Sequence, residues 1–145
     1  MMRFTIKEKV QGKKCANAAD IYRTMRGLSK ADQESFWAFG FSFYRKERCE
    51  IFRECISLGG MHWVFTDNKI LFRRLLIAGA DSWIALHNHP NEWCHPSEKD
   101  KEHAGILERV SNLLQLHFLD YMIVAGEKYY SFHENGLLND QKCLL

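Results

Sequence analysis

Residues 86–100 read Leu-His-Asn-His-Pro-Asn-Glu-Trp-Cys-His-Pro-Ser-Glu-Lys-Asp. His87 and His89 end an apolar run that begins at Trp83, so on a β-strand both imidazoles would point from the same face. Ser97 and Asp100 stand at the front of a long helical pattern with the spacing of a capping box, in which Asp takes the Glu/Gln position. The strand, the loop and the helix start can bring Asp100 back to the two histidines.

Two imidazoles and one carboxylate make three ligands of a tetrahedral Zn²⁺ ion. They leave the fourth position open for water, which is typical of a catalytic rather than a structural zinc site. A His-x-His pair alone is weak support, because most histidines have other roles. The ordered set is more specific, and we predict one Zn²⁺ per chain held by His87, His89 and Asp100. Fe²⁺ or Mn²⁺ would accept the same ligands.

The composition is that of an ordinary globular domain, with 46% hydrophobic and 26% charged residues in a chain of 145. A formal net charge of +2 argues neither for nor against nucleic acid. Residues 1–50 hold 11 Lys/Arg against 6 Asp/Glu, and residues 51–145 hold 9 against 12. The basic first part could meet an acidic partner, but a solvated face is the simpler interpretation.

The five cysteines are an odd number, are widely scattered and form no Cys-x-x-Cys pair. They are expected to be reduced thiols in a cytoplasm, since no secretory signal is recognisable. No stretch reaches the roughly 18 uninterrupted apolar residues of a spanning helix, so no membrane partner is expected.

Periodicity and turn residues predict alternating helices and strands. The expected helices cover residues 18–26, a segment ending at 78, and 97–116. Asn17 would cap the first helix, Thr66 or Asp67 the second, and Gly79 would end the second. The expected strands cover 34–44, 49–58, 82–86, 119–125 and 128–132. This order predicts an α/β fold, with a mixed central β-sheet flanked by helices on both faces. Residues 17–138 are expected to form one domain, preceded by an arm or short strand at 1–16 and followed by a tail at 139–145.

The motif resembles the JAMM motif of the MPN-domain metalloproteases, which reads His-x-His, seven residues, Ser, two residues, Asp. The resemblance extends to the RadC branch of that superfamily through His-Asn-His-Pro, Pro-Ser-x-x-Asp, Leu-Asp-Tyr-Met-Ile-Val at 119–124 and Glu-Asn-Gly-Leu-Leu at 134–138. It covers roughly residues 17–138. It implies a single MPN-like domain and a zinc-dependent hydrolase of peptide or isopeptide bonds.

A metallohydrolase of this kind also needs a base that lies beside the metal without ligating it. Glu34 is the candidate, because it opens the aromatic run 34–44 and because residues 33–37 are similar to the segment in which RadC-like proteins carry the JAMM glutamate. A purely structural charge at the start of an element is the alternative. The rivals upstream of the motif are Glu47, Glu50 and Glu54, which are expected to be solvated.

Ser97 would donate a hydrogen bond to a developing oxyanion, the role that the resemblance implies, or serve only as a helix N-cap, and both roles are compatible. Cys94 and His95 lie in the loop and could reach the open metal position, although loop residues between ligands usually point to solvent. His103 could support the ligands from the same helix face, but an exposed histidine is the simpler interpretation.

Two classes of function stay open: a zinc hydrolase of an unknown protein or peptide, and a non-catalytic RadC-like module associated with DNA repair or protein assembly. RadC-like chains usually carry a DNA-associated helix-hairpin-helix region, whereas about 16 residues precede the first helix here, so nucleic acid is a weakly supported partner. The loop at 91–95, with its bulky Trp93, departs from the small loop of the family. Substrate preference therefore does not carry over.

Overall fold

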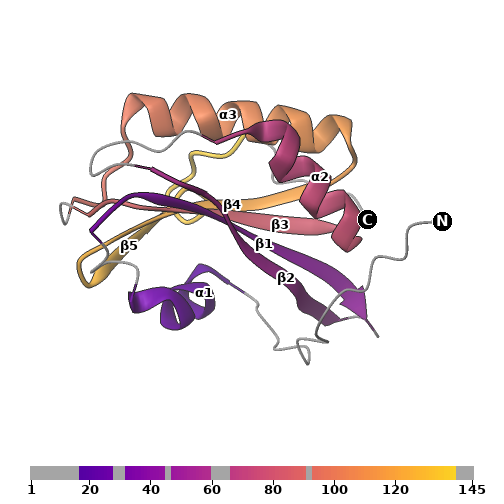
Figure 1. The fold of residues 1–145 in the computed structure, drawn as a ribbon, viewed down its shortest axis with the longest axis horizontal. Helices are drawn as coiled ribbons and strands as arrows, with labels where there is room; N and C mark the ends of the chain where they lie inside the picture. The colour runs from indigo at the N-terminus through magenta and orange to yellow at the C-terminus, as the bar shows by residue number, and fades with distance from the viewer. Residues whose placement is uncertain (1–16, 28–31, 45–46, 60–65, 91–92, 140–145) are drawn as a thin grey trace.

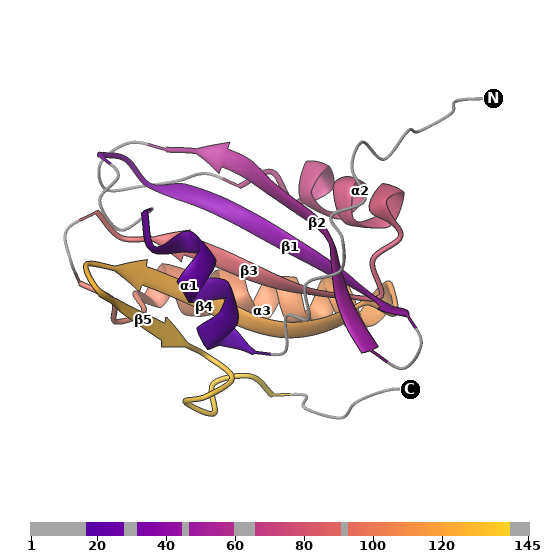
Figure 2. The same ribbon diagram turned by 90° about the horizontal axis from the view of Figure 1, so that it is seen from below.

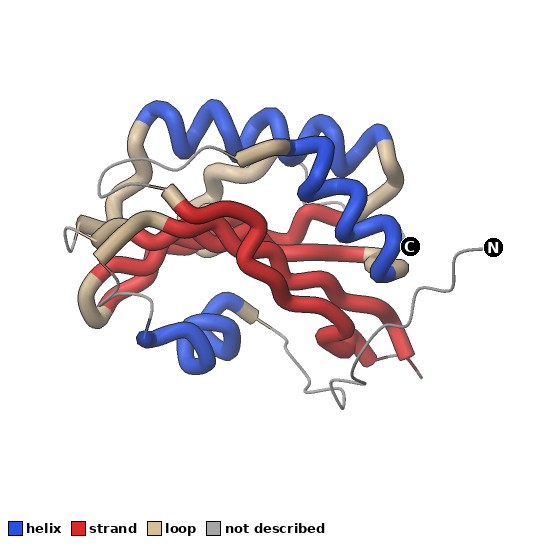
Figure 3. Tube along the Cα trace, in the orientation of Figure 1, coloured by secondary structure: helices blue, strands red, loops and turns tan. Residues whose placement is uncertain are grey.

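The computed structural model describes residues 17–27, 32–44, 47–59, 66–90 and 93–139. Within these ranges the elements follow the order α1 (Ala18–Met25), β1 (Ser35–Tyr44), β2 (Glu47–Leu58), α2 (Asn68–Ala78), β3 (Ser82–Asn88), α3 (Glu98–Leu113), β4 (His117–Ala125) and β5 (Lys128–Ser131). The sheet forms the middle layer, with α2 and α3 on one face and α1 on the other (Figures 1 and 3). The predicted arm at 1–16 and all but the first residue of the predicted tail lie outside the described residues.

The sheet is mixed and has the strand order β2-β1-β3-β4-β5, which can be followed from below in Figure 2. Strand β1 pairs antiparallel with both β2 and β3, whereas β3 pairs parallel with β4 and β4 pairs antiparallel with β5. The parallel pair requires a crossover, which α3 provides. The predicted α/β fold with a mixed sheet and helices on both faces is confirmed.

Helix ends follow the capping residues seen in the sequence. The Asn17 side chain accepts from the Asp20 N–H, and the Asp67 side chain accepts from the Lys69 and Ile70 N–H groups. Gly79 ends α2 with a left-handed φ of 75°, a conformation that glycine adopts without a steric cost. Strand β3 continues to Asn88, two residues beyond its predicted end, so it carries the first histidine of the motif.

The aromatic strand β1 supplies both sides of the core. Phe39 and Phe41 pack in the cluster beneath α1, and Ala38 packs in the cluster beneath α2 and α3. Gly40 is closely approached, as a glycine within a strand often indicates, because a Cβ there would lie 3.2 Å from the Ala80 Cβ and within 3.4 Å of Phe52. A larger side chain at this position would force the strands or α2 apart.

The apolar spacing in residues 68–78 predicts a buried stripe of Ile70, Leu71, Leu75 and Ala78, and Leu71 and Leu75 are indeed buried. Ile70 of α2 is 41% exposed, and Ile106, Leu113 and Leu114 at α3 are also exposed. The buried residues of α3 are instead Asp100, Ala104, Leu107, Glu108 and Ser111. The apolar pattern was misleading because this face carries small and polar residues with specific partners; for example, the Trp83 Nε1–H donates to Ser111 Oγ at 2.9 Å. Among the described residues, no helix is long and apolar enough to span a membrane.

A buried carboxylate holds the turn after β5 against β4. Asp120 is 3% exposed, and it accepts from the Ser131 hydroxyl and from the His133 N–H. Burial raises the pKa of Asp120 to about 6, although these hydrogen bonds partly offset the effect. Because the folded pKa exceeds that of an unfolded aspartate, its contribution to stability is complete below about pH 4 and is lost as the pH rises through 6.

The substitution Asp120→Asn should remove this pH dependence. The free energy of unfolding of the variant, relative to the parent protein, is expected to increase by about 2 kcal/mol between pH 4 and 7. Urea denaturation across this range measures the difference. Glu127→Gln, which changes an exposed carboxyl in the neighbouring β4–β5 turn, is the matched control and should leave the pH profile unchanged. A difference between Asp120→Asn and the parent that does not vary with pH would contradict the assignment.

Candidate metal centre

The register of β1 against β3 assembles the two histidines with Glu34. Phe36 pairs with His87, so by continuation Glu34 lies across from His89. Paired residues of antiparallel strands project from the same face, and so do residues two apart. Glu34, His87 and His89 therefore share the face that carries α2 and α3.

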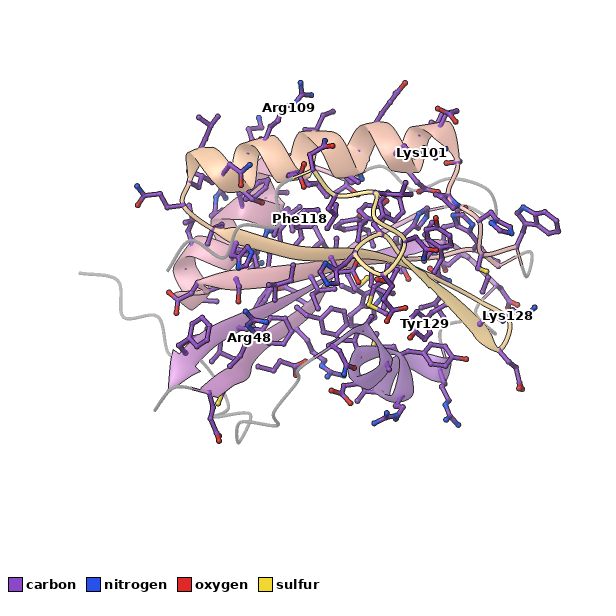
Figure 4. All side chains as sticks on the ribbon, turned by 180° about the vertical axis from the view of Figure 1, so that it is seen from behind. Arg48, Lys101, Arg109, Phe118, Lys128 and Tyr129 are labelled. Atoms are coloured by element: carbon purple, nitrogen blue, oxygen red, sulfur yellow. The ribbon has the colours of Figure 1, made fainter. Side chains whose placement is uncertain are left out.

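Asp100 arrives at this face through the predicted capping box. The Asp100 N–H donates to Ser97 Oγ at 3.1 Å, while the Ser97 N–H donates to Asp100 Oδ2 at 2.9 Å. The box fixes the carboxylate in the first turn of α3, at the end of the sheet marked by Lys101 in Figure 4. The helix start thus presents a buried carboxylate to the end of β3.

His87, His89 and Asp100 form the cluster that was predicted to bind metal. One ligand atom from each lies within 4.8 Å of the others. His87 Nδ1 is 2.9 Å from Asp100 Oδ1, and His89 Nε2 is 3.2 Å from Asp100 Oδ2. His87 and Asp100 are buried, so the cluster sits at the edge of the core rather than on a solvated surface.

The outer nitrogen of His89 has a fixed partner. His89 Nδ1 lies 2.6 Å from the carbonyl oxygen of Trp93, and a carbonyl only accepts, so Nδ1 carries the proton. In a neutral imidazole, Nε2 is then an acceptor, and it faces the acceptor Oδ2 of Asp100. A cation between these two acceptors, either a proton or a metal ion, is needed to make the contact favourable.

Glu34 lies beside the cluster, with Oε2 3.5 Å from His87 Nε2 and only 7% of the residue exposed. Its rivals have other surroundings. Glu50 forms an ion pair with Arg53, Glu54 pairs with Arg74, and Glu47 is exposed at the start of β2. Of the four carboxylates considered, Glu34 is the one in contact with a histidine of the motif.

Asn88, which was not predicted from the sequence, holds the Glu34 segment against β3. Asn88 is fully buried, and its Oδ1 accepts from the Ser35 N–H at 2.6 Å and from the Ser35 hydroxyl at 2.8 Å. Its Nδ2–H donates to the Gln33 carbonyl at 3.1 Å. Both neighbours of Glu34 are thus held by the residue between the two histidines. The available signal was a polar residue on the opposite face of an otherwise apolar strand.

Tyr121 also escaped prediction, although it contacts a proposed ligand. The buried Tyr121 hydroxyl donates to Asp100 Oδ1 at 3.3 Å, and burial beside that carboxylate raises the pKa of Tyr121 well above its usual value. Outer hydrogen bonds of this kind orient ligating carboxylates.

Charges in the cluster are strongly coupled. Burial alone would lower the pKa of His87, but Asp100 and Glu34 outweigh it and raise that pKa to about 9. Burial alone would raise the pKa of Asp100, but hydrogen bonds with His87, His89 and Ser97 hold it well below its usual range. The geometry therefore favours an ionised Asp100 with positive charge close to it.

The remaining histidine and cysteine candidates lie outside the ligand cluster. His103 is half-buried rather than exposed, and burial together with the charge of His87 lowers its pKa to about 4. Cys94 packs against the core beneath α2 and α3, and the ring of His95 lies between Trp93 and Tyr130. Among the described residues, neither loop side chain joins the three-residue cluster.

The donor set fits a divalent metal ion. Imidazole nitrogens and a carboxylate oxygen are the ligand types that Zn²⁺ and neighbouring metals bind. Within the described part of the chain, the buried His87 Nε2 has no hydrogen-bond partner, and His89 Nε2 faces a carboxylate. Both nitrogens can therefore turn to a metal ion without breaking another hydrogen bond, once His87, whose pKa is raised, releases its Nε2 proton.

Comparison with known proteins agrees with this geometry. The family model for the RadC-like JAB domain matches residues 15–137. A UPF0758 protein of Flavobacterium johnsoniae is 29% identical over 126 residues, which cover 86% of this chain and 54% of the relative. A UPF0758 protein of Chlorobium chlorochromatii is 30% identical over 128 residues, covering 88% and 57%. The chain thus spans about half the length of the curated relatives it matches.

One further relative matches over a shorter stretch but with higher identity. A UPF0758 protein of Cupriavidus pinatubonensis is 41% identical over 66 residues, which cover 46% of this chain and 29% of the relative. The family match includes Glu34, the two histidines, Ser97 and Asp100. With a mixed sheet, helices on both faces and the motif brought together at one end of β3, this chain belongs to the RadC-like JAB domain family.

Proposed function

We propose that this chain is a zinc-dependent metallohydrolase of the JAMM type that cleaves a peptide or isopeptide bond. The observation that carries the proposal is the buried carboxylate of Glu34, whose Oε2 lies 3.5 Å from Nε2 of His87 within the His87, His89 and Asp100 cluster. A carboxylate buried beside three ligand groups is costly unless the site uses its charge. A proton-transfer role gives it such a use.

The residues would divide the work as follows. His87, His89 and Asp100 would hold the ion, whose Lewis acidity acidifies water and polarises a carbonyl group. Glu34 would accept the proton that water loses as its oxygen bonds to the carbonyl carbon, and would return that proton to the leaving nitrogen as the carbon–nitrogen bond breaks. The products are a carboxylic acid and an amine.

Ser97 has two roles to combine. Its hydroxyl donates to Asp100 Oδ2 at 2.9 Å, which orients the ligand. Because Ser97 is exposed, its hydroxyl can rotate towards a bound carbonyl and donate to the developing oxyanion. Asp100 Oδ2 would then keep the hydrogen bond from the Ser97 N–H at 2.9 Å, so the ligand stays oriented when the hydroxyl turns away.

Metal binding is the first test. Titration calorimetry with Zn²⁺ should give about one ion per chain, and saturating metal should raise the melting temperature, because an ion bound to the folded state adds about 2.7 kcal/mol at a hundred times its dissociation constant. His89→Ala should weaken binding by more than the roughly 10–100-fold lost with an outer partner. The matched control is His133→Ala, which changes an exposed histidine. Equal affinities of the two variants would contradict the ligand assignment.

Glu34→Gln is the second test. This variant keeps the size of the side chain but removes the base, so cleavage of a peptide or isopeptide library should fall roughly 10²–10⁴-fold. Its affinity for Zn²⁺ should change little, because Glu34 is not proposed as a ligand. Glu54→Gln is the control. It removes the charge that pairs with Arg74, and it lies on β2, the neighbour of β1 that does not carry the motif, so activity should be kept.

The outcomes separate the two classes of function. Full cleavage by Glu34→Gln would remove the base from the mechanism. If the zinc-loaded parent protein cleaves no peptide or isopeptide bond, the alternative stands instead: a non-catalytic RadC-like module associated with DNA repair or protein assembly. Zinc that binds without any cleavage would then be structural.

A further inference from the structure

The indole of Trp93 is a large apolar surface beside the candidate metal centre. Trp93 is 65% exposed, although tryptophan is usually well buried. Its carbonyl oxygen lies 2.6 Å from Nδ1 of His89, so its backbone is tied to a proposed ligand. The residue that carries the exposed ring is therefore in direct contact with a proposed ligand. Only its backbone makes this hydrogen bond, so the contact does not depend on the indole.

Trp93 is also the outer member of a row of rings that leads into the core. The centroids of Trp93 and His95 are 5.6 Å apart, those of His95 and Tyr130 are 6.1 Å apart, and those of Tyr130 and Phe132 are 5.8 Å apart. Phe132 is buried, and Tyr130 lies on the edge strand β5. The row supports the exposed indole from beneath, which limits the conformational entropy lost when a partner binds it.

The charge around this row disfavours a phosphate backbone. Residues 93–102 and 126–134, which include the start of α3 and the β4–β5 hairpin, expose four acidic and three basic side chains, so within these described segments no positively charged groove surrounds the row. Lys101 and Lys128 mark these two segments at the same end of the molecule in Figure 4. Stacking of nucleic-acid bases on aromatic rings is normally accompanied by a positively charged groove. A polypeptide with an apolar side chain needs no such groove.

We infer that Trp93, supported by His95 and Tyr130, is a substrate-binding surface that receives a large apolar or aromatic side chain of an extended polypeptide at the metal centre. The inference rests on the proposed function for the class of partner. Trp93 lies in the loop that joins His89 to Asp100, and its own carbonyl orients His89. A substrate side chain bound on the indole would therefore lie next to the proposed metal ligands. Buried tryptophan contacts are frequent energetic centres of protein interfaces.

The test measures binding separately from cleavage. The zinc-loaded full chain is titrated with labelled peptides that share a neutral background and differ at one position, by fluorescence anisotropy. Peptides with Phe, Tyr, Trp, Leu or Met should bind at least tenfold more tightly than those with Ala or Asp. Trp93→Ala should abolish that preference, and Trp93→Phe should restore most of it. The affinity for Zn²⁺ should be the same in all three proteins, because the His89 contact is made by the backbone.

Leu113→Ala is the matched control for loss of an exposed apolar side chain. Leu113 is 83% exposed and ends α3, whose 16 residues span roughly 24 Å from the metal end. An unchanged preference in Trp93→Ala, an equal loss in Leu113→Ala, or a parent protein without preference for apolar peptides would overturn the inference. Binding of single-stranded oligonucleotides that depends on Trp93, without peptide binding, would overturn it in favour of base stacking.

These results are distinguishable from failure of the proposed function. Peptides that bind through Trp93 but are never cleaved would contradict the hydrolase and leave the binding surface standing. Cleavage that persists with the same residue preference in Trp93→Ala would support the hydrolase and contradict the binding surface.

Discussion

The candidate site depends on the register between β1 and β3. A shift of one residue in this pairing would turn the Glu34 side chain to the opposite face of the sheet, away from His87 and His89. Asn88 opposes such a shift, because its amide bonds both residues that flank Glu34. The residue between the two histidines therefore contributes as much to the geometry as they do, although it faces the other way. The pairing also joins residues more than fifty positions apart, so the site exists only in the folded sheet.

Asp100 unites the start of a helix with the proposed metal site. As the third residue of α3 it completes the capping box with Ser97, and the same carboxylate lies against both histidines. Donors from the cap and from Tyr121 leave the carboxylate little freedom to rotate. Such preorganisation lowers the entropic cost of binding an ion. It also means that a change at Ser97 would act on the helix, on the ligand and on any oxyanion contact together, so Ser97 is a poor position from which to infer a mechanism.

Local signals predicted the fold well, while side-chain environments needed the structure. Caps at Asn17 and Asp67, the turn at Gly79 and the close approach at Gly40 follow from backbone chemistry that is visible in the sequence. Hydrophobicity did not identify the residues that α3 buries, since it cannot show that Ser111 lies in the core and accepts a hydrogen bond from Trp83. The cluster of His87, His89 and Asp100 was predicted from the spacing of the motif and its resemblance to the JAMM motif, but Asn88 and Tyr121 act across strands, where sequence separation hides the contact.

Charge balance explains why these groups can share one edge of the core. Glu34 and Asp100 are both buried, and both lie within 3.5 Å of a His87 ring nitrogen. Two carboxylates in a region of low dielectric repel each other and lose hydration, so they need positive charge between them. A divalent cation held by Asp100 and the histidines would provide that charge and would leave Glu34 as the nearest anion that is not a ligand. His87 supplies part of this charge by itself, because both carboxylates raise its pKa, and a cation that took over this role would leave Glu34 free for the proton transfer proposed above.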